Sequence, residues 1–212
     1  MSDIIPGILE KDFFEIEKKI ELAKNFAKTI HIDIIDGKFA PNTTFLNPKP
    51  FEKYSRDVLL EAHFMVEEPI NYLESFAASG FKRFLGHIEK MTSQEEFVVK
   101  AEFLGEVGLA LDLDTQLESL KASFEDLDCL LIMGVKAGFS GQSFNPSVLE
   151  KVKKIREHSP IPVEVDGGIN EATITQGLIC GVNRFVTTSF LFNGDFTKNY
   201  QKLTALISTA NE

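Results

Sequence analysis

Short apolar runs alternate with longer amphipathic stretches along the whole chain. The short runs are rich in β-branched residues, which is typical of strands. They predict eight strands, at Ile4–Leu9, Thr29–Ile34, Leu59–Met65, Arg83–His87, Val107–Leu111, Cys129–Val135, Pro162–Val165 and Arg184–Thr187. The stretches between them predict helices at Lys11–Ala27, Pro69–Ser79, Ser93–Phe103, Pro146–His158, Glu171–Cys180 and Lys198–Ala210. Asn145 and Asn170 directly precede two of these helices and suit their N-cap positions.

This alternation predicts the fold. Eight strands, with a helix expected after each and no linker-like segment, favour a single closed (β/α)8 TIM barrel over residues 1–212. A doubly wound open sheet is the competing architecture. Polar residues stand at the ends of many predicted strands, and this favours closure because a barrel gathers those ends at one mouth.

Length and charge narrow the class of protein. The chain has 212 residues, 43% of them hydrophobic, and single-domain α/β barrels commonly run to about 200–250 residues. The net charge of −10 argues against nucleic acid as a partner, since binding it requires a basic stripe. A small anionic ligand stays possible, because backbone N–H groups bind phosphate whatever the net charge.

The sequence indicates no membrane partner and no secretion. No apolar run approaches the ~18 residues that span a bilayer. The segment Met1-Ser2-Asp3 lacks the basic flank of a signal peptide. Cys129 and Cys180 match neither a metal-ligand spacing nor a disulfide framework. We therefore expect a cytoplasmic protein with reduced thiols.

Four polar residues stand near the ends of predicted strands. His31 and Asp33 lie two residues apart in one apolar run, so their side chains share one face of the strand. His63 and Asp166 occupy similar places in two other strands. Burying an unpaired carboxylate is costly, so these residues suggest a shared cation. Two imidazoles and two carboxylates suit one divalent metal ion: Zn, Fe, Mn or Co.

Glycine-bearing and hydroxyl-bearing turns follow the last three predicted strands. They are Gly138-Phe139-Ser140-Gly141, Gly167-Gly168 and Thr188-Ser189. Loops after strands seven and eight commonly form phosphate sites in such barrels, and glycine lets the backbone approach an anion. Each glycine by itself is explained as well by a tight turn, whereas the turns together favour a phosphate-binding site.

These motifs resemble the signatures of the ribulose-phosphate 3-epimerase family. The matching segments are His31-Ile-Asp33-Ile-Ile-Asp-Gly37, Ala62-His63-Phe-Met65-Val66, Gly138-Phe-Ser-Gly141-Gln142 and Val165-Asp166-Gly-Gly-Ile-Asn170. The resemblance covers nearly the whole chain in order. The first and the last metal-ligand motifs are its specific part, since the glycine turns alone would not identify a family.

The resemblance implies an isomerase of the pentose phosphate pathway that binds one divalent metal and a small phosphorylated sugar. Its reaction would convert D-ribulose 5-phosphate to D-xylulose 5-phosphate through a cis-enediolate, with Asp33 and Asp166 as the two acid/base residues. The implied substrate contacts are Gly7, His63, Met65, Met133, Gly138, Phe139, Ser140, Gly141, Gly167, Gly168, Thr188 and Ser189. A homo-oligomer is a further expectation by resemblance.

Several positions depart from the family pattern. Gly7 stands where the family usually has a substrate-contacting serine, and Ile35 replaces a methionine. Thr188 replaces the glycine of a Gly-Ser turn, and Lys136-Ala137 and Asp112-Leu113 replace the usual loop residues. The expected metal ligands are all retained, whereas several residues that set substrate fit are not.

Three functions therefore stay open. They are a ribulose 5-phosphate epimerase, an epimerase of a related sugar phosphate such as a ketohexose 6-phosphate, and a non-catalytic phosphosugar-binding barrel. The pair Asp33 and Asp166 argues against pure binding, which requires no two facing carboxylates. His87 and Glu89 are either partners of a metal ligand or a satisfied polar pair at the barrel mouth. Lys136 is either solvated or directed at the anionic ligand.

Overall fold

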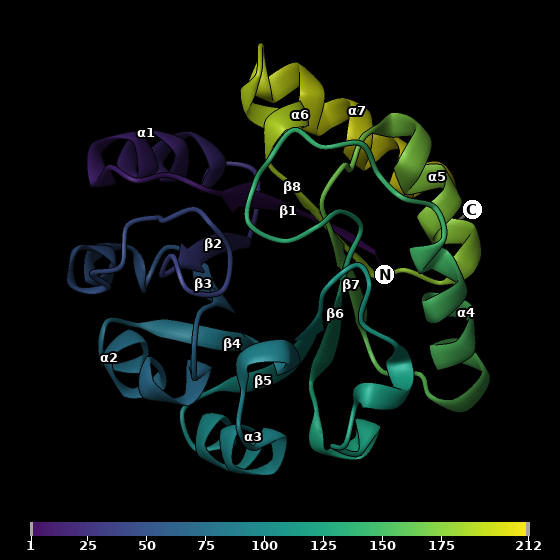
Figure 1. Cartoon of the computed structure of the whole chain (residues 1–212). Coiled ribbons are helices and arrows are strands. Elements are labelled where there is room, and N and C mark those ends of the chain that lie inside the picture. Colours follow the sequence, from purple (N-terminus) through teal and green to yellow (C-terminus); the bar gives the residue numbers. More distant parts are fainter. Residues whose placement is uncertain (1, 211–212) are drawn as a thin grey trace.

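The computed structural model describes residues 2–210 as a closed barrel of parallel strands. The strands are β1 (Asp3–Ile8), β2 (Thr29–Ile35), β3 (Leu59–Met65), β4 (Phe81–His87), β5 (Glu106–Leu111), β6 (Cys129–Met133), β7 (Val163–Asp166) and β8 (Arg184–Thr187). They pair in sequence order, and β8 pairs with β1 to close the sheet. Figure 1 shows the ring of strands with the helices outside it. The predicted TIM barrel is confirmed, and each predicted strand boundary lies within two residues of an observed one.

Helices cover the outside of the ring. They are α1 (Phe13–Ala23), α2 (Leu73–Ala78), α3 (Gln94–Glu102), α4 (Val148–His158), α5 (Glu171–Cys180), α6 (Ser189–Phe192) and α7 (Phe196–Ala210). Asn170 caps α5 as predicted, and its side chain accepts hydrogen bonds from the first-turn N–H groups. The N-cap of α4 is Ser147 and not the predicted Asn145, which instead accepts a hydrogen bond from the Ser147 N–H group.

The expectation of an α-helix after every strand is wrong at two places. Between β2 and β3, and between β5 and β6, the described chain forms only the 3₁₀ helices η1 (Lys49–Tyr54), η4 (Leu117–Ser119) and η5 (Phe124–Asp126). In the first segment Pro41, Pro48 and Pro50 remove backbone donors and disfavour a helix. In the second, the Ser123 hydroxyl accepts from the Glu125 N–H group, which offers the backbone an alternative to helical hydrogen bonds.

Alternating side chains sort the strand residues into two apolar layers. Ile32 and Ile34 lie in the layer between the sheet and the helices. Ile35, Met65 and Leu131 lie in a separate cluster inside the barrel. Burying a large apolar side chain stabilises a protein by about 1.5–3 kcal/mol, so both layers hold the strands in register. The face of β2 that carries His31 is therefore an inward face.

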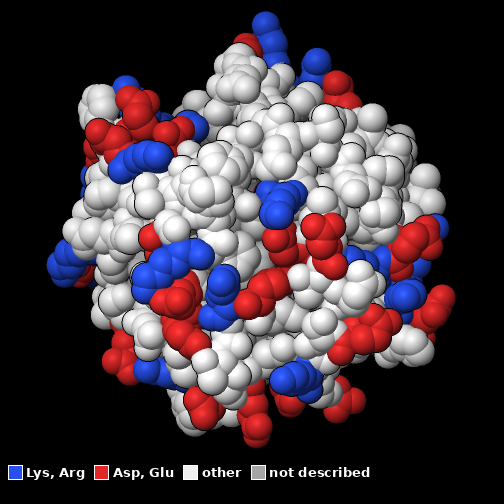
Figure 2. Space-filling view, viewed as in Figure 1, with Lys and Arg blue, Asp and Glu red and all other residues white. Residues whose placement is uncertain are grey.

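The surface of the described residues adds two observations. Lys and Arg side chains are interspersed with Asp and Glu on the face shown in Figure 2 and form no continuous basic stripe there. Within residues 2–210, no helix has both the length and the apolar character that a membrane crossing requires. Both cysteines are free thiols, and Cys129 is buried.

Candidate active site

Four polar side chains from β2, β3 and β7 meet inside the barrel. They are His31, Asp33, His63 and Asp166, and one donor atom of each lies within 4.8 Å of those of the others. The two imidazoles approach closely, with His31 Nε2 3.1 Å from His63 Nδ1. Asp33 Oδ1 lies 3.3 Å from the first nitrogen and 2.9 Å from the second. The structure thus brings together the residues that the sequence singled out as metal ligands.

The four residues do not all lie near the ends of their strands, although the sequence predicted this. Asp166 is the last residue of β7, but His31 is only the third residue of β2. His31 and His63 are both fully buried. The imidazoles therefore form the floor of the site, while the two carboxylates lie nearer the mouth of the barrel, where such enzymes keep their chemistry.

A buried ion pair lies behind His31. His31 Nδ1 is 2.6 Å from Glu61 Oε1, and Arg83 Nη1 donates to Glu61 Oε2 at 2.6 Å. Burial alone would raise the pKa of Glu61, but the hydrogen bond with His31 and the charge of Arg83 outweigh it and lower that pKa. An ionised carboxylate only accepts hydrogen bonds, so His31 carries a proton on Nδ1. Its Nε2 atom is directed at the cluster.

A second chain of hydrogen bonds lies behind His63. His63 Nε2 is 2.9 Å from His87 Nε2, and His87 Nδ1 is 2.8 Å from Glu89 Oε2. Burial opposes ionisation of Glu89, but its hydrogen bond with His87 lowers the pKa to about 2. Glu89 therefore accepts from His87 Nδ1, and His87 accepts at Nε2 from His63. Of the two alternatives for His87 and Glu89, the structure supports contact with His63, one of the four residues of the cluster.

The two imidazoles differ in charge when no metal is bound. Burial opposes protonation of His31, but the neighbouring carboxyl groups, Asp33 first among them, raise its pKa well above the ordinary value. Burial lowers the pKa of His63 to about 4, so this ring is neutral at pH 7. His31 Nε2 therefore holds a proton in the metal-free protein, and a bound cation would replace that proton.

The resulting donor set fits a divalent metal. The outer nitrogen of each imidazole is occupied by a hydrogen bond, so the inner nitrogen and the two carboxyl groups face one point. Nitrogen lone pairs and carboxylates at this distance repel one another unless a cation or a shared proton lies between them. Nitrogen and oxygen donors of this kind suit Zn, Fe, Mn or Co.

The two carboxyl groups have opposite pKa shifts. Burial would raise the pKa of Asp33, but the protonated His31 outweighs burial through its hydrogen bond and its charge, and the pKa falls to about 2. Burial raises the pKa of Asp166 to about 8, and the neighbouring charge of Asp33 adds to this shift. Without a metal, one group is therefore a carboxylate and the other a carboxylic acid at neutral pH. Such a pair is suited to acid/base chemistry.

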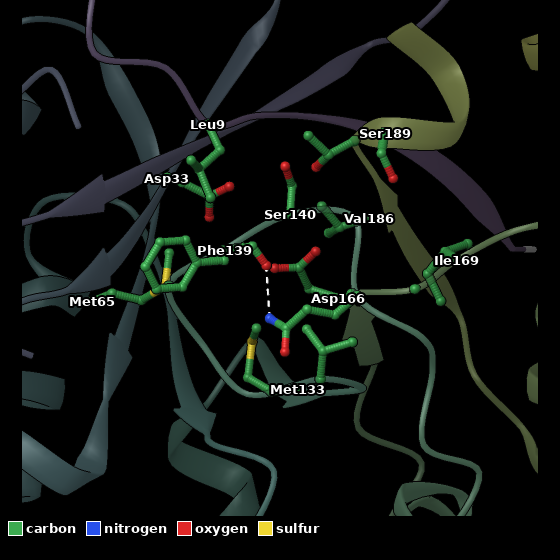
Figure 3. Close-up of a pocket in the computed structure, with 17 residues that line it drawn as sticks. Leu9, Asp33, Met65, Met133, Phe139, Ser140, Asp166, Ile169, Val186 and Ser189 are labelled. Atoms are coloured by element: carbon green, nitrogen blue, oxygen red, sulfur yellow. Dashed lines mark hydrogen bonds between the residues drawn. The ribbon is translucent and has the colours of Figure 1, made fainter. Parts of the chain in front are cut away.

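A pocket opens from the carboxylates to the barrel mouth. Figure 3 shows Asp33 and Asp166 pointing into it, with Met65 and Met133 beside them. Ten of the expected substrate contacts line it: Met65, Met133, Gly138, Phe139, Ser140, Gly141, Gly167, Gly168, Thr188 and Ser189. His63 and Gly7 are not part of the lining, since His63 lies beneath the carboxylates and Gly7 lies against Thr188.

The loop after β6 borders the pocket. Asn42 Nδ2 donates to the Gly138 carbonyl at 2.8 Å, which ties this loop to the one after β2. The Ala137 N–H group donates to Asp112 Oδ1 at 2.9 Å. Two of the departures from the family pattern therefore contact each other. The Lys136 side chain is exposed, in agreement with the simpler alternative that it is solvated.

The glycines after β7 agree with both explanations given for them, a tight turn and a place in the binding pocket. Gly167 and Gly168 have φ angles of 100° and 70°, in the left-handed region that favours glycine. A Cβ atom at Gly168 would also lie 2.5 Å from the Phe144 backbone nitrogen. A tight turn therefore requires glycine here, and the same turn lines the pocket.

Sequence patterns alone did not single out the buried partners of His31. Glu164 is fully buried and 3.5 Å from His31 Nδ1, and its carboxyl oxygens form no hydrogen bond with residues 2–210. Burial and the nearby charge of Glu61 raise the pKa of Glu164. One signal was available, because Glu61 and Glu164 stand two residues before His63 and Asp166 and so share their inward faces.

Comparisons with known proteins agree with the motifs. The model of the ribulose-phosphate 3 epimerase family matches residues 3–192. The ribulose-phosphate 3-epimerase of Bacillus subtilis is 33% identical over 202 residues, covering 91% of this chain and 93% of that protein. The protein of the same name from Chlamydia pneumoniae is 36% identical over 188 residues, covering 84% of this chain and 81% of its own.

Solved structures that are similar to this chain support the assignment of the fold. KGPDC from Streptococcus mutans has a TM-score of 0.75 at 12% identity and covers 99% of this chain and 99% of its own. The 3-hexulose-6-phosphate synthase of Salmonella typhimurium has a TM-score of 0.74 at 12% identity, with 99% and 100% coverage. At such low identity these likenesses support the barrel alone. The family match and the curated relatives carry the assignment: the chain belongs to the ribulose-phosphate 3-epimerase family, a family of isomerases.

Proposed function

We propose that this chain is a metal-dependent epimerase that inverts C3 of a ketose phosphate, converting D-ribulose 5-phosphate to D-xylulose 5-phosphate. The observation that carries the proposal is the pair Asp33 and Asp166, which lie on different strands at one pocket and have opposite pKa shifts. The names of the curated relatives support the choice of substrate.

The metal would be held by His31, Asp33, His63 and Asp166. When bound, a divalent cation would supply Lewis-acid stabilisation of the negative charge that develops on the ketose oxygens. The two hydrogen-bonded chains, through Glu61 and through His87, keep the inner imidazole nitrogens directed at that ion's position before it binds.

Inversion at C3 requires a group on each face of the substrate, because a single base tends to return the proton to the side from which it took it. The Asp33 carboxylate would accept the C3 proton. The Asp166 carboxyl group would then donate a proton to C3 from the other face. In the reverse reaction the two residues exchange roles, so the same pair serves both directions.

The remaining pocket residues would hold the sugar phosphate in place. The Gly167-Gly168 turn and Ser189 would offer backbone and hydroxyl groups to the phosphate. Met65 and Met133 would pack against the sugar and exclude water from the carboxylates. Cytoplasmic location stays a prediction from the sequence, and homo-oligomeric assembly stays a prediction from the resemblance.

The first experiment is turnover in deuterated water. Metal-loaded protein is incubated with D-ribulose 5-phosphate, and NMR follows the proton at C3. Deuterium at C3 together with xylulose 5-phosphate would support both the substrate and the proton-transfer step. Neither signal, with bound metal confirmed by elemental analysis, would contradict the proposal.

The four proposed metal ligands require a separate test. We expect His63→Ala to lose metal on dialysis, because one of four donors disappears from a buried site. His158→Ala is the matched control, since that imidazole lies exposed at the end of α4. Unchanged metal stoichiometry in His63→Ala would remove this residue from the ligand set.

A second candidate is an epimerase of a ketohexose 6-phosphate. The observation that favours it is the hydrogen bond between the Ala137 N–H group and Asp112, which joins two loops that depart from the family pattern. The same deuterium experiment with a ketohexose 6-phosphate separates the two candidates, since the chemistry at C3 is shared and only the sugar differs.

A further inference from the structure

Gly7 and Thr188 lie against each other where β1 and β8 meet. Pro6 pairs with Thr187 in the register of these strands, so the next residues are neighbours. A Cβ atom at Gly7 would lie 2.5 Å from Thr188 Oγ1 and 2.7 Å from Val186 Cγ1. Real Cβ atoms do not approach other atoms so closely, so the Thr188 hydroxyl occupies the space that a side chain at position 7 needs.

The reason for glycine at position 7 is therefore contact and not backbone conformation. Gly7 belongs to the extended strand β1 and is not among the glycines with positive φ. Any residue could adopt this backbone. Only the neighbouring side chains at the end of β8 exclude a larger residue, so positions 7 and 188 constrain each other.

The Thr188 hydroxyl is available to a ligand. Thr188 lines the same pocket as Asp33, Asp166 and the Gly167-Gly168 turn. Its carbonyl accepts from the Phe192 N–H group, but its Oγ1 atom makes no hydrogen bond with any described residue. A hydroxyl of a pocket-lining residue that has no partner among the described residues can donate to a bound oxygen.

Thr188 lies between the two carboxylates and the turn that is expected to bind phosphate. Gly7 pairs with His31 on the β2 side, and Val186 pairs with Asp166 on the β7 side. Figure 3 shows Val186 between Asp166 and Ser189. Thr188 follows Val186 by two residues, so it stands above the carboxylates, beside the turn expected to bind phosphate.

We propose that Thr188 is a specificity-determining residue whose hydroxyl donates to an oxygen of the bound sugar phosphate, and that Gly7 makes room for it. This inference rests on the proposed function, because it assigns a contact to that same ligand. The family pattern given by the resemblance has a serine at the first position and a glycine at the second. In this chain the hydroxyl is instead at the end of β8, and the two positions are in contact.

Removing the hydroxyl without changing the shape tests the contact. We expect Thr188→Val to raise KM for the accepted ketose phosphate about tenfold, the usual effect of one lost neutral hydrogen bond. The kcat value should stay close to that of the wild type, because a contact made equally in the ground state and the transition state changes KM alone. The affinity for the metal should also stay, because Thr188 is not one of the four proposed metal ligands. Thr188→Ser, which keeps the hydroxyl, should restore KM. An unchanged KM in Thr188→Val would overturn the contact.

Exchanging the pair tests the coupling. Gly7→Ser alone should lower both Tm and substrate affinity, because its Cβ meets Thr188 Oγ1. Combining it with Thr188→Gly should recover part of both losses, since the contact with Thr188 is then removed and only the one with Val186 is left. Additive losses in the double variant would show that the two positions are independent and would overturn the coupling. Because Tm is measured without substrate, this readout does not depend on turnover.

Calorimetric titration of the wild type and of Thr188→Val distinguishes failure of the Thr188 contact from failure of the proposed function. If the wild type binds the ketose phosphate and Thr188→Val binds it equally well, this inference fails and the proposed function stands. If the metal-loaded wild type neither binds nor converts ribulose 5-phosphate or a ketohexose 6-phosphate, the proposed function fails and the contact at Thr188 fails with it.

Discussion

The two sides of the barrel interior differ sharply in chemistry. From β2, β3, β4 and β7, the inward side chains include His31, Glu61, His87 and Glu164. From β5 and β6, they are apolar or weakly polar, as at Leu131. Both sides are buried to the same extent, with all five of these residues fully inaccessible. Burial stabilises the apolar side, whereas on the polar side it costs free energy that pairing must offset.

This difference indicates that the polar side of the barrel interior carries the candidate active site. The polar side is held by hydrogen-bonded chains that lead outward from the ligands. Arg83 binds Glu61 and also Glu106, and Glu89 accepts from the Asp112 N–H group as well as from His87. The apolar side has no such requirement. We therefore expect changes on the polar side to affect metal and catalysis, and changes on the apolar side to affect stability.

The largest effect should come from Asp166→Asn. Loss of one acid/base group should lower kcat by about 10³-fold. The fold should persist, because the raised pKa of about 8 means that this group is mostly protonated in the metal-free protein, and an amide resembles it. Steady-state kinetics and Tm of the metal-free protein measure the two effects. Asp3→Asn, at an exposed position in β1, is the control. Full activity in Asp166→Asn would contradict the two-base arrangement.

On the apolar side, Leu131→Ala should destabilise the protein by about 2–5 kcal/mol, because it leaves a cavity inside the barrel. Metal affinity should change little. Urea unfolding and a metal titration measure the two quantities, with Leu22→Ala as the control since that leucine is 40% exposed. A large loss of metal affinity with unchanged stability would show that the two sides are not separate.

A smaller effect should follow from His87→Leu. The substitution removes the group that accepts a hydrogen bond from His63 Nε2. The position of the proton on His63 and the orientation of its ring are then no longer fixed. Loss of such a partner typically lowers metal affinity about 10–100-fold. Competition with a chromogenic chelator measures the dissociation constant. The same affinity in wild type and variant would mean that the chain through His87 does not position His63.

The smallest effect should come from Glu89→Gln, and it should depend on pH. The folded-state pKa of Glu89, about 2, lies below its ordinary value of 4.5. Ionised Glu89 therefore stabilises the folded state above pH 4.5, and this contribution is lost as pH falls toward 2. We expect a difference of about 1 kcal/mol between wild type and variant at pH 7, shrinking by about pH 3. Urea unfolding at both pH values checks it, and a constant difference would contradict the assignment.

The barrel and the four residues that meet inside it could be predicted because their signals are local. Alternation of apolar residues marks each strand, and the spacing of His31 and Asp33 places both side chains on one face. The two missing α-helices were harder to foresee. A segment with prolines, or with hydroxyls that bind its own backbone, competes with helix formation in ways that periodicity does not register.

The sequence by itself determined the strands, the barrel and the residue types that suit a metal. Only the tertiary structure decided which side chains touch. His87 reaches His63 across 24 residues, Arg83 reaches Glu61 across 22, and Gly7 meets Thr188 across the closure between β1 and β8. These contacts depend on strand register and on closure of the sheet. Both are set by packing over the whole barrel, and for that reason no local pattern encodes them.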